Sequence, residues 1–216
     1  YDVFVSKLDS SGDLVWAKNF GGGVNDYGES VAVDSSGNVY TTGYFSGTVD
    51  FDPGSGTTNL TSNGVEDVFV SKLDSSGNYV WAKSFGGTHT DYGFSVAVDS
   101  SGNVYTTGYF NGTGDFDPGS GTANITSNGN TDVFVSKLDS SGNYVWAKNL
   151  GGTDGDGGYS VAVDSSGNVY TTGTFKNTVD FDPGPGTTNL TSNGYADVFV
   201  SKLDSSGNYV WAKSFG

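Results

Sequence analysis

The sequence contains no cysteine, no methionine and no arginine, and it has one histidine and four prolines among 216 residues. Without cysteine, the fold has no disulfide framework and no thiol chemistry. The single histidine, His89, has no cysteine or histidine partner, so we expect it to be solvated rather than part of a zinc site or a serine-activating triad. The lack of methionine, even at position 1, indicates a processed protein or a segment of a longer one.

Positive charge is also scarce. Nine basic residues oppose 24 acidic ones, which gives a formal net charge of −15 at pH 7. Such a chain repels nucleic acid and anionic membranes, so we expect no nucleic-acid partner. No run of about 18 apolar residues is present, and we therefore expect no membrane insertion. This charge suits an extracellular protein or one that lives with divalent cations.

Glycine and aromatic residues, in contrast, are abundant. Glycine accounts for 35 residues and aromatic residues for 14% of the chain. A disordered low-complexity polymer would be rich in glycine but poor in aromatics. Many short strands joined by tight turns accommodate both.

A repeat of 65 residues organises the whole chain. The segment DVFVSKLDSSG begins at Asp2 and recurs at Asp67, Asp132 and Asp197. Residues 2–66 and 67–131 differ at only 13 of 65 positions. The tryptophans keep the same spacing: Trp16, Trp81, Trp146 and Trp211. We expect these tryptophans to pack in the core or between repeats, because they recur at a structural period.

Four segments of each repeat have the composition of strands: SVAVD (30–34), NVYTTGYF (38–45), DVFVSKLD (67–74) and YVWAKSF (79–85). They are rich in β-branched and aromatic residues. DSSGN occurs six times between such segments, and DSSGD occurs once, at 9–13. Asp, Ser and Gly in this order are typical of a short hairpin loop. Seven hairpins predict 14 strands, and no segment has the period of a helix.

Apolar residues fall on both faces of these predicted strands, as in VFV and YVW. Sheets of this kind must be covered on both sides, so we expect neighbouring units to stack face to face. Four antiparallel strands per unit, stacked radially, describe a propeller blade. The predicted fold is therefore all-β: a propeller-like array of four-stranded antiparallel blades.

The passage DYGFSVAVDSSGNVYTTGYF (91–110), together with DVFVSKLDSSGNYVWAKSFGG, resembles the bacterial β-propeller repeats of the SBBP type, which are related to NHL repeats. The resemblance implies that SVAVD is the innermost strand of each blade and YVWAK the outermost. The blades would then be residues 21–85, 86–150 and 151–216, and residues 1–20 would be the two outer strands of a half blade. This chain departs from the family pattern by a long insertion near 46–66.

Three and a half blades do not close a propeller, which needs about four to eight. The chain therefore either belongs to a longer array or leaves open edges that another copy covers. Because the repeats are nearly identical, such edges favour head-to-tail assembly into a ring or a filament. Other copies of the chain are the partners that we expect.

The insertion contains a recurring DFDPG motif. Alternate residues of an extended segment point to one side, so its two carboxylates could converge on one Ca²⁺. The alternative is a turn, in which the second aspartate caps the chain before Pro-Gly. The segment TTNLTSNG (57–64) could order the insertion as a short extra strand, and we favour this alternative. The candidate metal ligands are Asp50, Asp52, Asp115, Asp117, Asp180 and Asp182.

As catalytic groups, the paired aspartates are poor candidates. A glycosidase places its two carboxylates in different environments, whereas these pairs recur in identical surroundings. No other constellation supports catalysis, so we expect no enzyme activity, no catalytic residue and no cofactor other than the calcium considered above.

The expected function is a non-enzymatic, extracellular or cell-surface scaffold of bacterial type, structural or adhesive, that assembles with copies of itself. The alternative is a binding module whose inter-strand loops recognise a glycan or a protein. The repeats differ most at 23–29, 44–49 and 65–66 and at the equivalent positions, which are predicted loops. Propellers commonly place binding residues there, although neutral drift accounts for such differences equally well.

Overall fold

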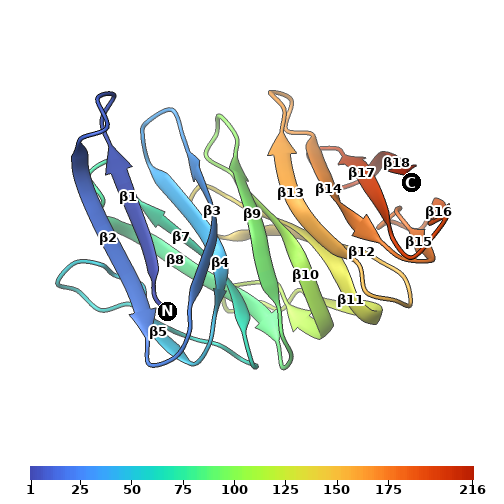
Figure 1. The fold of residues 1–216 in the computed structure, drawn as a ribbon, viewed down its shortest axis with the longest axis horizontal. Helices are drawn as coiled ribbons and strands as arrows, with labels where there is room; N and C mark the ends of the chain where they lie inside the picture. The colour runs from blue at the N-terminus through green and yellow to red at the C-terminus, as the bar shows by residue number, and fades with distance from the viewer.

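The computed structural model describes all of residues 1–216 and contains strands, turns and bends but no helix. The all-β prediction is confirmed. No helix long and apolar enough to cross a membrane occurs. The strands form successive antiparallel units that run from the N-terminal end at the left to the C-terminal end at the right (Figure 1).

The first complete blade consists of β3 (Tyr27–Val33), β4 (Val39–Phe45), β7 (Asp67–Leu73) and β8 (Tyr79–Gly87). They are hydrogen-bonded in that order, and all pairs are antiparallel. Nearly every residue of β4 and β7 is buried. The middle strands of the blade are buried on both faces, which explains why their sequences do not alternate between apolar and polar residues.

The second blade has the same order but longer middle strands: β9 (Tyr92–Val98), β10 (Val104–Asp115), β11 (Asn124–Leu138) and β12 (Tyr144–Leu150). Its β10 and β11 continue into the insertion without a break in either strand. The register shifts between Asn111 and Thr113, which marks a bulge where the blade ends and the insertion begins.

The third blade comprises β13 (Gly157–Val163), β14 (Val169–Phe175), β17 (Asp197–Leu203) and β18 (Tyr209–Phe215). The chain begins with a separate pair, β1 (Val3–Leu8) and β2 (Leu14–Gly22). These two strands correspond to β7 and β8 of the next repeat. The blade strands number 14, as the seven hairpins predict, and four short insertion strands bring the total to 18.

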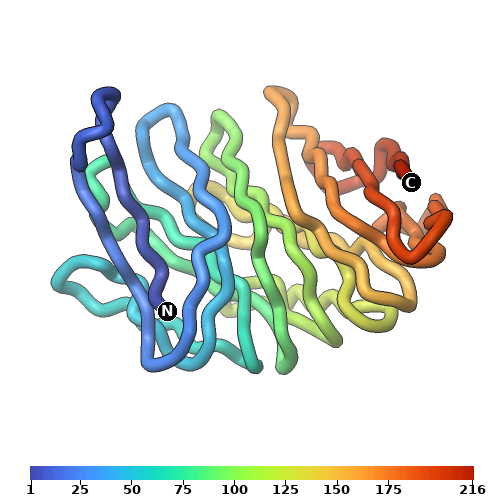
Figure 2. The backbone as a smooth tube through the Cα atoms, in the orientation of Figure 1, coloured from blue at the N-terminus to red at the C-terminus, as the bar shows by residue number.

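The DSSGN loops fold as their chemistry predicts. In the first, Asp34 Oδ1 accepts hydrogen bonds from the backbone N–H groups of Ser36 and Asn38, at 2.9 Å each. Gly37 has φ of +80°, a conformation that favours glycine. The tips of the inner hairpins line up along one edge of the molecule (Figure 2). The same hydrogen bonds recur in every repeat, so each hairpin closes in the same way.

The insertion forms a two-stranded hairpin of β5 (Thr48–Asp50) and β6 (Asn59–Thr61) in the first repeat and of β15 (Thr178–Asp180) and β16 (Asn189–Thr191) in the third. The predicted extra strand within 57–64 is therefore present. The sequence did not predict how this hairpin attaches to the rest of the fold. Its strand β5 pairs with the outer strand of the preceding unit, β2, through Gly21↔Asp50 and Gly22↔Val49.

The same crossing recurs at the next two junctions. Gly114 and Asp115 of β10 pair with Gly87 and Gly86 of β8, and Gly151 forms a bridge to Asp180. The β8–β10 pairing formally joins the first two blades into one eight-stranded sheet. It involves only two residue pairs, and the inner strands β3, β9 and β13 otherwise pack side by side as parts of separate blades. Each insertion therefore ties its blade to the one before.

Phenylalanines fill the space between the blades and the insertions. Phe51, from the centre of the first DFDPG motif, is fully buried. Its ring centroid lies 5.2 Å from that of Phe20, 5.3 Å from Phe45 and 5.1 Å from Phe69. The four rings come from two successive repeats. The insertion is thus part of the core that joins them.

Candidate functional site

The DFDPG motif closes the insertion hairpin. Asp50 ends β5, and its Oδ1 accepts hydrogen bonds from the backbone N–H groups of Asp52 at 3.0 Å and Thr58 at 2.8 Å. Asp52 Oδ1 accepts one from the N–H of Gly54 at 2.8 Å. Both carboxylates therefore stabilise backbone that no strand partner satisfies. This geometry matches the turn alternative.

The other two copies repeat these contacts. Asp115 and Asp180 each accept two backbone hydrogen bonds across the hairpin, and Asp117 and Asp182 each accept one within the turn. No group of three or more acidic or histidine side chains is placed to hold a metal ion. Nothing in these contacts tests calcium binding, which stays a prediction for all six aspartates.

Buried carboxyl groups lie instead at the junctions between blades. Asp67 and Asp91 are both 0% exposed, and they approach each other across the backbone of Gly86. A Cβ atom built on Gly86 would lie 2.7 Å from Asp91 Oδ2 and 3.0 Å from Asp67 Oδ1. Glycine is required here because the two carboxyl groups occupy the space of any side chain. At the next junction, a Cβ atom on Gly151 would meet the buried Asp132 carboxyl group, and the buried Asp156 accepts a hydrogen bond from the N–H of Gly152 at 2.8 Å.

The two aspartates of a pair differ in their hydrogen bonds. Asp91 accepts from the N–H of Gly87 at 2.6 Å and from that of Asn111 at 3.0 Å. Asp67 Oδ2 accepts from the N–H of Asn63 at 3.0 Å, whereas its Oδ1 is buried without a partner. Burial raises the pKa of Asp67 to about 6, and the nearby Asp91 carboxylate adds to the effect. Burial likewise raises the pKa of Asp132 to about 6.

The sequence did not predict the pairing of Asp67 with Asp91 or of Asp132 with Asp156. A signal was available. Asp26, Asp91 and Asp156 are identical among the repeats although most residues around them differ. A constant carboxyl group within a variable loop indicates a structural contact.

The tryptophans join repeats, as predicted. Trp81 is 8% exposed, and its Nε1 donates a hydrogen bond to the backbone carbonyl of Ser140, 59 residues away, at 3.2 Å. Trp16 and Trp146 make the same bond to Ser75 and Ser205. His89 is exposed, and its Nδ1 lies 3.2 Å from Thr88 Oγ1.

The chain matches three copies of one sequence family, described as "Beta-propeller repeat" (SBBP), at residues 15–44, 80–117 and 145–174. It is 31% identical over 240 residues to an uncharacterized WD repeat-containing protein of Acanthamoeba polyphaga mimivirus, covering 97% of this chain and 17% of the relative. It is 29% identical over 200 residues to the regulatory protein FlaEY of Caulobacter vibrioides, covering 91% of this chain and 20% of that protein. The chain thus spans a fifth or less of each relative.

Among solved structures, the chain aligns with a protein of unknown function from Bacteroides caccae. The alignment covers 95% of this chain and 87% of that one, at 11% sequence identity and a TM-score of 0.32.

Proposed function

Because this chain belongs to the SBBP family of β-propeller repeats, which makes it an interaction or structural module, we propose that it is a non-enzymatic scaffold that associates end to end. We place it outside the cell or at the cell surface, in a structural or adhesive role. The observation that carries the proposal is one contact between repeats, which is made at the first two junctions inside the chain and divided at its two ends.

That contact is an edge-to-face pair of phenylalanines. The ring centroids of Phe20 and Phe69 lie 5.8 Å apart with an interplanar angle of 89°. Phe85 and Phe134 repeat the pair one unit further on, at 5.9 Å and 86°. In both, the first ring lies near the end of an outer strand, β2 or β8, and the second lies on the strand next to the outer one in the following blade, β7 or β11. Such pairs stabilise an interface beyond the area that they bury.

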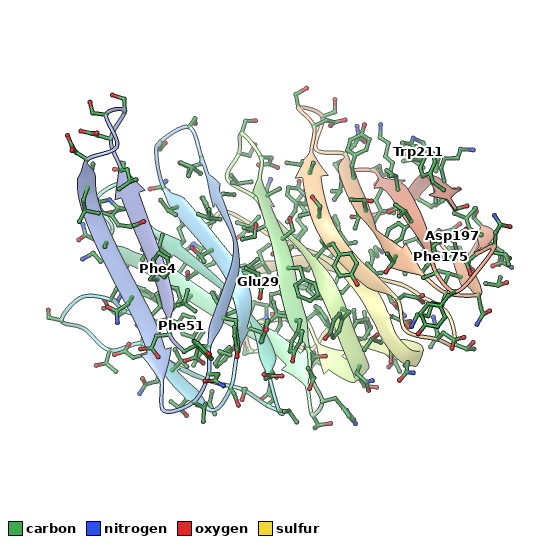
Figure 3. The ribbon with its side chains drawn as sticks, viewed as in Figure 1. Phe4, Glu29, Phe51, Phe175, Asp197 and Trp211 are labelled. Carbon is green, nitrogen blue, oxygen red and sulfur yellow. The ribbon has the colours of Figure 1, made fainter.

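The two ends of the chain each expose one half of this pair. Phe4, the counterpart of Phe69, is 77% exposed, whereas Phe69 is fully buried. Phe215, the counterpart of Phe85, is 62% exposed, whereas Phe85 is 2% exposed. Phe4 lies on β1 at one end of the molecule, and Trp211 marks the other (Figure 3). A second copy can supply to each end the ring that the neighbouring repeat supplies inside the chain.

The backbone at the N-terminal end is also open. β7, the counterpart of β1, pairs with β4 on one side and β8 on the other, but β1 pairs only with β2. An unpaired edge strand beside exposed apolar side chains favours association with a further strand. In a longer protein, an adjoining repeat would cover the same surface, and the 216-residue chain would be one segment of a continuous array.

Sedimentation and electron microscopy of the 216-residue chain over a range of concentrations test the proposal. We expect species larger than one chain, and rings or filaments in the images. Added salt should strengthen association, because it screens the net charge of −15 that separates the copies. A single-chain mass at every protein and salt concentration would contradict the proposal.

A pair of variants connects assembly to the ends. Phe4→Ser removes an exposed ring from the proposed contact and should weaken association by about tenfold or more. Val80→Ser is the control, because Val80 is exposed on an outer strand away from both ends. Equal association of the two variants would argue against this interface. The proposed location is tested separately, by protease treatment of intact source cells followed by detection of the released repeats.

A further inference from the structure

Residues that break the repeat symmetry meet in one pocket. The three repeats differ at about a quarter of their 65 positions. A pocket of about 250 Å³ in the second repeat is lined by six residues: Val65, His89, Thr90, Tyr109, Asn111 and Thr131. All six occupy positions at which the repeats differ. A random selection of surface residues would include mostly invariant positions, so this pocket is built from what is specific to one repeat.

The substitutions change the chemistry of the position. The counterparts of His89 are Val24 and Asp154, and Tyr109 corresponds to Thr174 in the third repeat. Asn111 corresponds to Ser46 and Lys176. The strands beneath the pocket, in contrast, carry the same buried residues in each blade. The fold explains the constant residues, and a binding role would explain why unlike residues gather at one place on the loops.

The corresponding place in the third repeat is engaged by the chain itself. Lys176 Nζ lies 4.6 Å from the ring centroid of Tyr195 and donates a hydrogen bond to its hydroxyl at 3.2 Å. Asn177 Nδ2 donates to Asp154 Oδ2 at 2.7 Å. Tyr195, Lys176 and Asp154 are the counterparts of Asn130, Asn111 and His89. The shorter side chains of Asn130 and Asn111 make no such contact in the second repeat, and the pocket is open there.

Free hydrogen-bonding groups line the pocket. The side chains of Thr90, Tyr109, Asn111 and Thr131 make no hydrogen bond within the chain, although the backbone N–H of Asn111 donates to Asp91. Together they present three hydroxyl groups and one amide, which donate and accept equally well. His89 uses Nδ1 beside Thr88 and leaves Nε2 for a ligand. Burial raises the pKa of Tyr109 to about 12, so its hydroxyl is neutral at physiological pH.

A row of aromatic rings adjoins the pocket and fixes Tyr109. Its ring centroid lies 5.0 Å from that of Tyr92 and 5.4 Å from that of Phe94. The row continues from Tyr92 to Tyr44 at 3.8 Å and from Phe94 to Tyr159 at 5.6 Å. It therefore crosses all three blades on their inner two strands. These positions also differ among the repeats, where Glu29 and Tyr159 stand in the place of Phe94.

We propose that this pocket binds one residue of a neutral carbohydrate chain. A sugar ring offers hydroxyl groups at its rim and C–H groups on its faces, which match the free polar side chains and the apolar surfaces of Tyr109 and Val65. The volume suits a single ring more closely than a drug-sized ligand. An anionic ligand fits poorly, because no lysine lines the pocket and the chain carries a net charge of −15. This role goes beyond the scaffold and does not require assembly.

The test uses the 216-residue chain and a panel of immobilised neutral oligosaccharides that end in glucose, galactose, mannose, fucose or N-acetylglucosamine. Binding to any retained sugar is then measured by titration calorimetry. Tyr109→Thr and Thr131→Ala introduce the residues that the third repeat has at these positions, and a thermal melt of each variant checks that it is folded. Lys176→Asn, which introduces the residue of the second repeat into the third, is the matched control.

We expect at least one sugar to bind, Tyr109→Thr to weaken that binding by about tenfold or more, and Lys176→Asn to leave it unchanged. Retention of no sugar on the panel would overturn the proposal. So would equal binding by the wild type and Tyr109→Thr. A parallel panel of neutral peptides distinguishes the other class of ligand: peptide binding that depends on Tyr109, without sugar binding, would also overturn it. Sedimentation of the same variants reports assembly independently.

Discussion

Trp81 and Ser140 are joined by a hydrogen bond from the indole Nε1 to the backbone carbonyl, 3.2 Å long, across the junction of two blades. The bond connects an outer strand to the outer hairpin loop of the following repeat. It recurs with the same length at Trp16 and at Trp146, so it is a property of the repeat. Trp211 makes no such bond within residues 1–216.

Replacement of this tryptophan should destabilise the chain in a position-dependent way. Trp81→Phe removes the indole hydrogen bond and leaves the Ser140 carbonyl with only the longer one from Lys72 Nζ, at 3.5 Å, which we expect to lower the free energy of unfolding by about 1 kcal/mol. Trp211→Phe is the internal control and should lower the free energy of unfolding by a smaller amount. Thermal and denaturant unfolding of both variants measure the difference, and equal losses would show that the hydrogen bond contributes nothing.

The buried aspartates predict that stability rises as the pH falls from about 7 toward about 5. The pKa of Asp67 and of Asp132 is about 6 in the folded chain, above the ordinary value of 3.8. Protonation therefore favours the folded state in the window between these two values, and charge disfavours it above pH 6. Melting temperatures measured between pH 7 and pH 5 test whether stability rises or falls as the pH is lowered. A steady loss of stability between pH 7 and pH 5 would contradict it.

Asp67→Asn isolates the cause of that dependence. The amide keeps an acceptor for the Asn63 N–H but carries no charge, so the variant should be more stable than the wild type at pH 7, by about 1 kcal/mol after allowance for solvent screening. Its melting temperature should also vary less with pH. Asp2→Asn is the matched control, because Asp2 is the exposed counterpart of Asp67. A similar stabilisation by both substitutions would point to net charge rather than to burial.

Gly86 should not tolerate a side chain. In Gly86→Ala, the new Cβ would press on the carboxyl groups of Asp67 and Asp91, and the backbone φ of +156° is one that alanine rarely adopts. We expect a loss of about 2 kcal/mol or more in unfolding free energy. Gly23→Ala, whose Cβ would meet no atom within 4 Å, should change stability little. Chemical denaturation of the two variants measures the contrast.

Thermal unfolding with added calcium and with a chelator tests calcium binding. Because Asp50 and Asp52 already accept backbone hydrogen bonds, we expect neither calcium nor a chelator to shift the melting temperature. A ligand that binds only the folded chain must raise the melting temperature, so an increase with calcium that Asp50→Asn abolishes would establish the cation site.

Asp50→Ala should destabilise the hairpin by about 1 to 2 kcal/mol, since it leaves two N–H groups without their acceptor.

The sequence predicted the repeat, the blade strands and the hairpin loops because these depend on local chemistry. Gly37 and Asp34 define their loop without reference to the rest of the chain. The pairing of β5 with β2 could not be predicted in this way. It joins Gly21 to Asp50 through backbone groups, which carry no side-chain signature, and it links the β1–β2 pair to the following blade.

The candidate site was predicted less well for a related reason. Asp50 and Asp52 lie where the spacing placed them, but their function in the turn depends on which N–H groups lack other partners. The convergence of Val65, His89 and Tyr109 on one pocket requires the folded blade, although the variability of each position was visible in the repeat alignment.

The crossing of each insertion onto the preceding blade also sets the order in which the molecule can come apart. A central blade is attached to the preceding unit by its own insertion hairpin and to the following unit by the hairpin of that unit, whereas a terminal unit lacks one of these attachments. Unfolding should therefore start at the terminal units and proceed inward, and the ends of a longer array would unfold first under tension.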